Sequence, residues 1–424
     1  MSPATDVVSM DYQSDRTYPP YLSSTAEVRV LAGWKAGLLR IEQGGGRFAF
    51  LSDPTRQAVV SPRGAQSVPS RTPNVVDNRA MDAWLVLADW QRATDLRAVG
   101  ECQYRDYWRS VIARGRGNDE ERLFLDPKSG FPVKLERREE HILWGDVQVE
   151  YLWSIWTPVG GTSALAPRYT FRLVEGEVQQ ERISPAFAFA PDSGILRIPD
   201  SVAALMNMPP FVPDTVRVSA TTFVLRTPSY TNVVTLQRDT VWVLDAQTNE
   251  DRARQDSLWI GRLFPGTHKI AVVVTDLAFP HIGGVRYWVA NGATIVSHAN
   301  SEAFLRRVVN RRWTYHPDLL SRNTKVPFRF RAINKDTEMA QGALRMVPID
   351  GIGSEGALLV YLTNDRLLYA GDYIQGGGPG SFSAVYAREV VAAAKRARLT
   401  PTSFVAMHVP LTGWNQLPRF GAEP

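Results

Sequence analysis

An unbroken apolar run, Ile270 to Val274, ends in Thr275 and Asp276 and is followed by the glycine pair Gly283-Gly284. Such a run, ended by polar side chains, is typical of a strand that is covered on both faces. Strands of this kind belong to layered domains in which helices pack on a sheet. This run therefore constrains the fold of the C-terminal half of the chain more than any other feature.

The segments around this run alternate between strand and helix patterns. Thr240 to Leu244 predicts a short buried strand, and Thr248 to Leu263 predicts a helix with Asn249 as a candidate cap. Strands alternating with helices indicate an α/β layered domain. The other expected segments are a helix over 283–290, a strand over 294–297, a helix capped by Ser301, a hairpin over 358–370, a helix over 384–398 and a strand over 403–409.

The N-terminal half has a different pattern, in which short strands follow one another. Between residues 109 and 183, turn sequences at Asp126 to Gly130 and at Glu175-Gly176 separate β-rich segments. Trp84, Leu85, Leu87 and Trp90 recur at helical spacing, so a helix is expected over 81–94. We therefore predict an α+β protein in which an antiparallel curved β-sheet precedes an αββα sandwich.

Three parts are expected along the chain. Residues 1–25 are polar and predict a flexible arm. The proline-rich stretch Met208 to Pro213 marks a boundary, which gives a β-rich domain over 26–207 and a layered domain over 208–424.

Composition excludes some classes of protein. The 424 residues, 44% hydrophobic and 21% charged, are typical of a globular chain. No run reaches the roughly 18 apolar residues of a membrane-spanning helix, and the single Cys102 allows no intramolecular disulfide. The net charge of +5 is small, so no nucleic-acid partner is expected, while a protein partner or a homo-oligomer stays open.

The segment Val272 to Gly284 reads Val-Val-Val-Thr-Asp-Leu-Ala-Phe-Pro-His-Ile-Gly-Gly. It resembles the signature of the metallo-β-lactamase superfamily, where a buried strand ends in Thr and continues into His-x-His-x-Asp-His. Ligands at alternate positions point the same way, and the adjacent Asp-His serves a second ion. Two metals can then hold a water-derived hydroxide between them.

The resemblance extends from about Val216 to Leu417 and implies the αββα fold of that family. It rests on further segments that stand in the family's order, which are Val241 to Asp245, Gly292 to His298, Leu367 to Asp372 and Ala406 to His408.

The departures from the signature fall on the metal ligands. Asp276 stands for the first histidine, Ala278 for the second and Pro280 for the aspartate, while His281 remains. The middle histidine of the family is expected at Gly353. The first metal site has therefore lost its three histidines, and Asp276 is only a weak replacement.

The second metal site keeps more of its ligands. His281, Asp372 and His408 could hold one zinc or iron ion, with Asp276 as a further ligand or as a general base. Pro280 restrains the loop, so the direction of the His281 side chain is open. The alternative is that these residues are former ligands that are now packed or hydrogen-bonded.

Three functions follow from these features. The favoured one is a non-catalytic scaffold or binding protein without a cofactor, because fold alone assigns no activity and the site has lost its ligands. The second is a single-metal hydrolase of ester or lactam type. The third is binding of a lipid or another apolar ligand by the N-terminal sheet.

The N-terminal half has a resemblance of its own. Leu123 to Val133 and Trp144 to Val147 are similar to the curved-sheet domain, related to lipoprotein carriers, that precedes some exported bacterial metallo-hydrolases. This implies an exported or periplasmic bacterial protein whose signal is missing from the sequence, with a cytoplasmic protein as the alternative. Trp144, Trp153 and Trp156 either line an apolar groove or belong to the core.

Two further segments have an alternative functional interpretation. The glycine-rich stretch Gly376 to Gly380 lacks the Lys and Ser/Thr of a phosphate loop, so a flexible loop is expected. A basic stretch is either an anion site for phosphate, sulfate or a partner, or a solvated helix face followed by an edge strand, which we favour. Its members are Arg306, Arg307, Arg311, Arg312, Arg322, Arg329 and Arg331.

Overall fold

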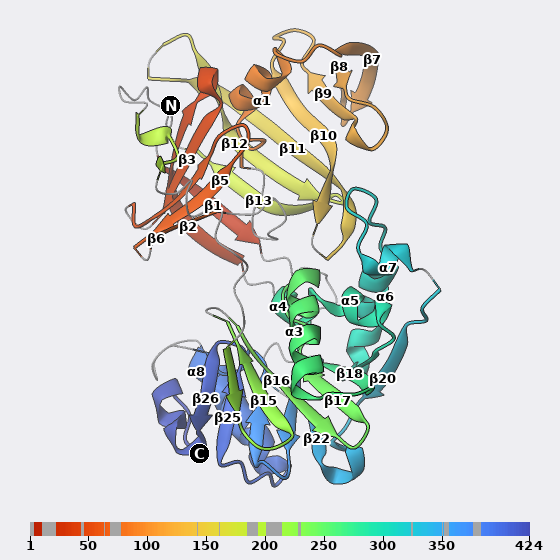
Figure 1. Ribbon diagram of the computed structural model, residues 1–424. Coiled ribbons are helices and arrows are strands. Elements are labelled where there is room, and N and C mark those ends of the chain that lie inside the picture. The colour runs from red at the N-terminus through yellow and green to blue at the C-terminus, as the bar shows by residue number, and fades with distance from the viewer. Residues whose placement is uncertain are drawn as a thin grey trace. The chain divides into compact units, whose positions relative to one another are not determined.

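The computed structural model divides the chain into two compact units, one ending at Pro209 and the other beginning at Pro210 (Figure 1). No helix among the described residues is long and apolar enough to cross a membrane. The structure describes residues 4–10, 23–43, 46–62, 64–67, 78–141, 143–160, 162–184, 194–200, 214–227, 230–323, 325–349, 351, 356–375 and 383–424.

The described part of the N-terminal unit is built on one antiparallel sheet of 13 strands, in the order β6-β5-β4-β3-β2-β1-β13-β12-β11-β10-β9-β8-β7. Most neighbours in the sheet are also neighbours in the chain, as expected for successive hairpins. At the turn between β12 and β13, Glu175 and Gly176 both have positive φ, which matches the twist of a tight hairpin. The strands are β1 (Ala4–Met10), β2 (Ser23–Gly33), β3 (Leu38–Gln43), β4 (Phe48–Ser52), β5 (Gln57–Ser61), β6 (Gly64–Ser67), β7 (Arg97–Tyr104), β8 (Tyr107–Arg114), β9 (Glu121–Leu125), β10 (Pro132–His141), β11 (Gly145–Pro158), β12 (Leu165–Val174) and β13 (Glu177–Ile183), with short 3-10 turns η1 (Trp34–Ala36), η2 (Gly117–Asp119) and η3 (Gly194–Leu196).

Strand β1 differs from the flexible arm that the sequence predicts for residues 1–25. It pairs with β13 through Asp6 and Ile183 and with β2 through Thr5 and Val28. Its segment contains Thr5, Val7 and Val8, and β-branched residues favour strands. The polar composition of the surrounding residues concealed this short strand.

Helix α1 (Ala83–Trp90) packs on the sheet, close to the expected helix over 81–94. The Asp82 carboxylate caps it by accepting hydrogen bonds from the backbone N–H groups of Trp84 and Leu85. Its buried side chains join a core cluster that includes Leu123, Leu135 and Trp153 from the strands.

The C-terminal unit has four layers, because two sheets face each other and each carries helices on its outer face. The first sheet has the order β14-β15-β16-β17-β18-β19-β20 and the second β21-β22-β23-β24-β25-β26. The strands are β14 (Asp214–Arg217), β15 (Thr222–Arg226), β16 (Thr231–Gln237), β17 (Thr240–Leu244), β18 (Lys269–Val274), β19 (Thr294–His298), β20 (Arg329–Ile333), β21 (Thr337–Met339), β22 (Leu344–Pro348), β23 (Leu358–Leu362), β24 (Leu367–Tyr369), β25 (Ser403–Ala406) and β26 (Val409–Gly413).

Helices fill the connections between the parallel strands, which need a long crossover segment. The core between the sheets contains Trp242, Val273, Met346 and Tyr369, while α8 packs with Phe404 on the outer face of the second sheet. The helices are α3 (Glu250–Leu263), α4 (Phe279–Ile282), α5 (Val285–Ala290), α6 (Glu302–Asn310), α7 (Leu319–Arg322) and α8 (Ser383–Arg396), with 3-10 turns η4 (Ala299–Ser301), η5 (Ala340–Gly342) and η6 (Trp414–Phe420).

The expected caps and closing strand of this unit differ in their outcomes. Asn249 caps α3 as predicted, because its side chain accepts a hydrogen bond from the Arg252 N–H. Ser301 stands at the cap position of α6, but its side chain makes no cap hydrogen bond and its hydroxyl lies 3.5 Å from the Gly356 carbonyl. The closing segment over 403–409 is not one strand, since β25 turns into β26 at Met407 and His408.

Candidate active site

The site begins where two parallel strands end at the same edge of a sheet. Asp245 follows β17 and Thr275 follows β18, and these strands are neighbours. The Asp245 carboxylate accepts hydrogen bonds from the Thr275 backbone N–H at 2.8 Å and from the Thr275 hydroxyl at 2.9 Å. Asp245 has a φ of 71°, a left-handed conformation that Asp tolerates better than most residues.

His281 lies in the short helix α4 and is fully buried. Its Nδ1 atom lies 2.8 Å from Asp245 Oδ2. The loop is fixed by backbone hydrogen bonds, because Ala246 N–H donates to the His281 carbonyl and Thr248 N–H donates to the Pro280 carbonyl. The imidazole therefore points toward Asp245. The sequence leaves this direction open, because Pro280 restrains the loop.

Tyr369, at the end of β24, donates its hydroxyl to Asp245 Oδ2 at 2.7 Å. The next glycine allows the close approach of this segment, since a Cβ atom on Gly371 would lie 2.6 Å from the Thr275 hydroxyl oxygen. Gly371 also has a φ of 53°, which favours glycine. The first and second sheets of the unit are thus joined at one buried carboxylate.

Asp276 lies next to this cluster and is 8% exposed. Its carboxylate accepts a hydrogen bond from the Ala278 backbone N–H at 2.6 Å. Burial raises the pKa of Asp276, and the nearby charge of His281 opposes this. Burial lowers the pKa of His281, but the charge of Asp245 outweighs it and, with Asp276 and Asp372, raises this pKa to about 9.

Asp372 and His408 form a more exposed pair on the second sheet. Asp372 follows β24, and His408 lies in the turn between β25 and β26. His408 Nε2 lies 3.2 Å from Asp372 Oδ1, and the ring of Tyr230 lies 5.3 Å from the His408 ring. The Met407 N–H donates to the Gly371 carbonyl at 2.7 Å, which holds the two segments together.

We define the His281 cluster as Asp245, Thr275, Asp276, His281, Tyr369, Asp372 and His408. The sequence predicts Asp276, His281, Asp372 and His408 as site residues. Asp245 and Tyr369 lie within family-like segments, but their role as the centre of the cluster was not predicted. The signal is their position at strand ends beside the motif.

The residues present do not fit a two-metal centre. Ala278 and Pro280, which the sequence resemblance aligns with two metal ligands, have side chains without a donor atom. Among the described residues, no group of three or more His, Cys, Asp or Glu side chains is placed to hold a metal ion. Gly353, where the family's middle histidine is expected, lies outside the described residues, as do Gly376 to Gly380 and Met208 to Pro213.

Two atoms of the cluster are buried without a hydrogen bond to any described residue. They are His281 Nε2 and Asp372 Oδ1, the second of which lies at ion-pair distance from His408. A histidine whose other ring nitrogen binds a carboxylate is the arrangement that orients metal ligands and general bases. The cluster keeps this orientation without the rest of a ligand set.

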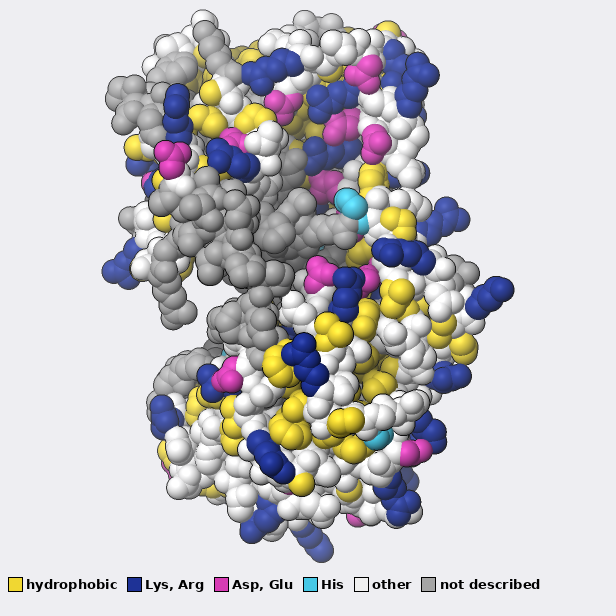
Figure 2. Space-filling view, viewed as in Figure 1, with side chains coloured by type: hydrophobic (Ala, Val, Ile, Leu, Met, Phe, Trp, Pro, Cys, Tyr) yellow, Lys and Arg dark blue, Asp and Glu magenta, His cyan; other side chains and the backbone are white. Residues whose placement is uncertain are grey.

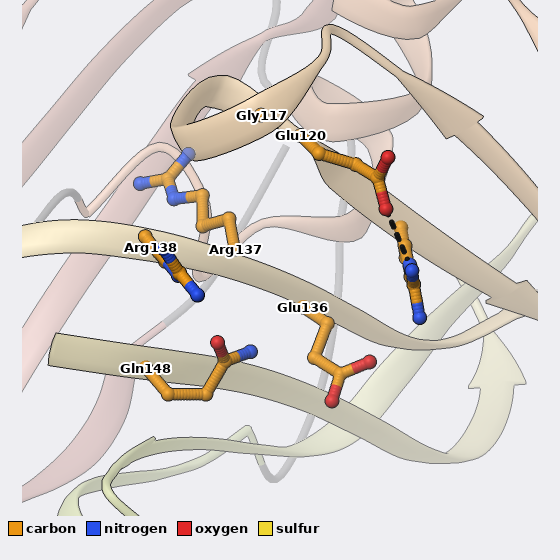
Figure 3. Close-up of a pocket in the computed structure, with 7 residues that line it drawn as sticks. Gly117, Glu120, Glu136, Arg137, Arg138 and Gln148 are labelled. Carbon is orange, nitrogen blue, oxygen red and sulfur yellow. Dashed lines mark hydrogen bonds and ion pairs between the residues drawn. The ribbon is translucent and has the colours of Figure 1, made fainter.

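The N-terminal sheet holds two pockets that bear on ligand binding. One, of about 370 Å³, is polar and carries charges of both signs from Glu120, Arg122, Glu136, Arg137 and Arg138, beside Gly117 and Gln148 (Figure 3). The other, of about 260 Å³, lies beside Trp34, Trp84 and Leu87. None of the three tryptophans that the sequence suggested lines it, since Trp153 is buried in the core and Trp144 and Trp156 are half-buried and pack against that core.

Comparisons with known proteins give a likeness of fold over half of the chain. No family model matches the chain, and no curated protein matches it. It is similar to the metallo-β-lactamases from Hirschia baltica, Erythrobacter litoralis and Pontibacter korlensis, at 13%, 14% and 15% identity and TM-scores of 0.38, 0.37 and 0.37. These matches cover 50%, 50% and 49% of this chain and 99%, 95% and 97% of those structures.

Proposed function

We propose that the C-terminal unit is a metallo-β-lactamase-fold domain that serves as a non-catalytic scaffold or binding protein. The observation that carries the proposal is the saturation of Asp245 by three side chains, His281, Thr275 and Tyr369. A buried carboxylate whose two oxygens both accept hydrogen bonds fixes the strands that carry the donors. In this proposal, residues that would serve a metal centre instead join the two sheets.

The loss of ligand types supports the same conclusion. Hydrolysis with two metals needs both ions to activate one water. Ala278 and Pro280 offer no donor atom, and Asp276 is engaged by the Ala278 N–H. The loss of these donor atoms supports a role without two-metal hydrolysis.

Metal content tests the proposal directly. The chain is purified without chelator, and zinc and iron are measured by mass spectrometry alongside a His281→Ala/His408→Ala variant. We expect far less than one equivalent of metal in both proteins, and no turnover of ester or lactam substrates after zinc is added. About one equivalent in the unaltered chain, lost in the variant, would restore the single-metal hydrolase.

A second measurement separates the scaffold role from a failure to fold. His281 is fully buried, whereas the His408 side chain is 37% exposed. We expect His281→Ala to destabilise the C-terminal unit and His408→Ala to leave it nearly unchanged. Equal stability of both variants and the unaltered chain would contradict the scaffold role of His281.

A further inference from the structure

The segment 303–335 concentrates positive charge far above the rest of the chain. Its only carboxylate is Asp318, so it carries a net charge of +8, and the remaining residues together carry −3 of the chain's +5. The expectation of no nucleic-acid partner rested on the charge of the whole chain. The nine cations are Arg306, Arg307, Arg311, Arg312, Arg322, Lys325, Arg329, Arg331 and Lys335.

Neighbouring carboxylates leave most of this charge uncompensated. Asp318 is buried and pairs with Arg286, which lies outside the segment. Arg322 and Arg329 donate only to backbone carbonyls, those of Pro317 and Gly292. Among the described residues, no carboxylate lies within ion-pair distance of Arg312, Arg322, Lys325, Arg329, Arg331 or Lys335, all of them exposed.

Arginines of the N-terminal sheet, in contrast, have carboxylate partners. Arg114 pairs with Glu121, and Arg122 pairs with Glu120. Arg137 pairs with Glu139. Exposed cations that lack such partners attract anions from solution.

The fold gathers the cations of this segment around the edge strand β20, on both of its faces, at one side of the C-terminal unit. The Arg306 guanidinium of α6 lies 5.1 Å from the centre of the Phe328 ring, at the start of β20. Among the described strands, β20 is the edge of its sheet, and it pairs only with β19. Figure 2 shows Lys and Arg side chains along this side, at the right, where α6, α7 and β20 lie.

We propose that this surface, formed by α6, α7, β20 and their connections, binds a single-stranded nucleic acid. Guanidinium groups recognise phosphates through paired hydrogen bonds. The half-buried rings of Phe328 and Phe330 lie 5.9 Å apart, and the Phe328 ring lies next to the Arg306 guanidinium. Arg329 and Arg331 alternate with the two rings along the chain and therefore line the opposite face of the same edge strand. Basic grooves with interleaved aromatic rings bind single strands, because a ring can stack an unpaired base.

The composition of the surface disfavours a membrane. The large hydrophobic side chains that are exposed in the described part of the chain lie outside residues 303–335. Insertion into a bilayer needs apolar side chains that project from the surface. The aromatic pair is half-buried and lies next to Arg306, which suits stacking with a flat base better than contact with an acyl chain.

The alternative explanation is protection of a free sheet edge. Charged side chains such as Arg329 and Arg331 on an edge strand prevent pairing with other chains. This explanation does not account for Arg312, Arg322 and Lys325, which lie outside the strand and have no carboxylate within ion-pair distance among the described residues. It predicts no salt-dependent binding, so the two explanations are separable.

The test is fluorescence anisotropy of the full chain with labelled oligodeoxythymidine and oligouridine at low and moderate salt. The variant is Arg312→Gln/Arg322→Gln/Arg329→Gln/Arg331→Gln. A control variant removes the same charge from exposed arginines elsewhere in the unit, as Arg226→Gln/Arg254→Gln/Arg262→Gln/Arg398→Gln. Circular dichroism checks that both variants fold.

We expect both oligonucleotides to bind and the affinity to fall steeply with salt. The slope of log K against log salt is negative. In the variant it should become less negative by about 0.7 for each phosphate that the protein no longer neutralises. The control should keep the slope of the unaltered chain. No binding at low salt, an equal decrease of affinity in the control, or binding to phosphatidylserine vesicles without binding to oligonucleotides would overturn the proposal.

Discussion

Each unit holds a carboxylate among its strands, half-buried Glu139 in the N-terminal sheet and fully buried Asp245 in the C-terminal unit, and the two are compensated differently. In the N-terminal sheet, Glu139 receives Arg137 at 2.6 Å, Arg172 at 2.9 Å and the Tyr151 hydroxyl at 2.7 Å. In the C-terminal unit, Asp245 receives one histidine and the neutral donors of Thr275 and Tyr369. Glu139 is thus compensated by two permanent cations, whereas Asp245 is compensated by one titratable imidazole.

The difference concerns whether all polar atoms of each network have a hydrogen-bond or ion-pair partner. A guanidinium stays charged, so the Glu139 network is complete by itself. The Asp245 network ends at His281, whose Nε2 atom is buried without a partner among the described residues. An oriented imidazole of this kind also occurs in metal ligands and general bases, and the Glu139 network described above contains no such group.

Removal of the Asp245 charge should have the largest effect. Asp245→Asn keeps a residue that tolerates the left-handed backbone but replaces one acceptor oxygen by a donor amide. Because three side-chain donors then face a poorer partner, we expect a loss of about 3–5 kcal/mol in the stability of the C-terminal unit. Urea titration read by hydrogen exchange on β17 and β18 measures it. A loss below about 1 kcal/mol would remove Asp245 from the centre of the unit.

Acid should affect the N-terminal unit next most strongly. Burial raises the pKa of Glu139, but Arg137 and Arg172 outweigh it and lower this pKa to about 2. A lowered pKa means that the contribution to stability is complete above the ordinary value near 4.5 and is lost as the pH falls toward 2. The urea midpoint read on β10 and β11 should therefore fall over this range.

Glu139→Gln is the matched control for the acid experiment. It should lower the midpoint at neutral pH and flatten the decrease between pH 4.5 and 2, because no carboxylate remains to be protonated at this position. The difference at neutral pH should be about 2–3 kcal/mol. An unchanged pH profile in the variant would assign the acid sensitivity to other groups.

The third largest loss of stability should come from a substitution at Gly371, where two backbone segments lie close together. The Asp245 network needs Gly371, where a Cβ atom would meet the Thr275 hydroxyl. Gly371→Ala should displace Thr275 and impose a strained φ, for a loss of about 2 kcal/mol. Gly176→Ala in the N-terminal hairpin is the control, because it has positive φ but no atom within 4 Å of the added Cβ. Equal losses would show that backbone strain alone is responsible.

The sequence predicted the C-terminal elements well, because each leaves a local signal. The apolar run at Ile270 to Val274 and the cap at Asn249 require only neighbouring residues. The centre of the site could not be predicted in the same way. Tyr369 reaches Asp245 across 124 residues of sequence, and no periodicity carries such a pairing. The direction of His281 depends likewise on hydrogen bonds from Ala246 and Thr248 to its loop.

In the N-terminal half, the sequence predicted the hairpins but not strand β1. The hairpins between 109 and 183 were predicted because turn residues separate them, whereas β1 has no such turn pattern in its polar surroundings. Its partners, β13 and β2, include a strand more than 170 residues away in sequence. Long-range strand pairing is specified by the whole sheet and not by the segment itself.

The smallest expected effect is the difference between two tyrosines, each of which donates a hydrogen bond to a carboxylate, fully buried Asp245 or half-buried Glu139. Tyr369 donates to Asp245 and Tyr151 donates to Glu139, each at 2.7 Å. Tyr369→Phe should cost about 2 kcal/mol, and Tyr151→Phe about 1 kcal/mol, since Glu139 keeps two cations while Asp245 loses one of few donors. Hydrogen exchange read separately on the two units measures both losses in one experiment. A larger loss of stability for Tyr151→Phe would contradict the idea that the two permanent cations make Glu139 less dependent on its tyrosine than Asp245 is.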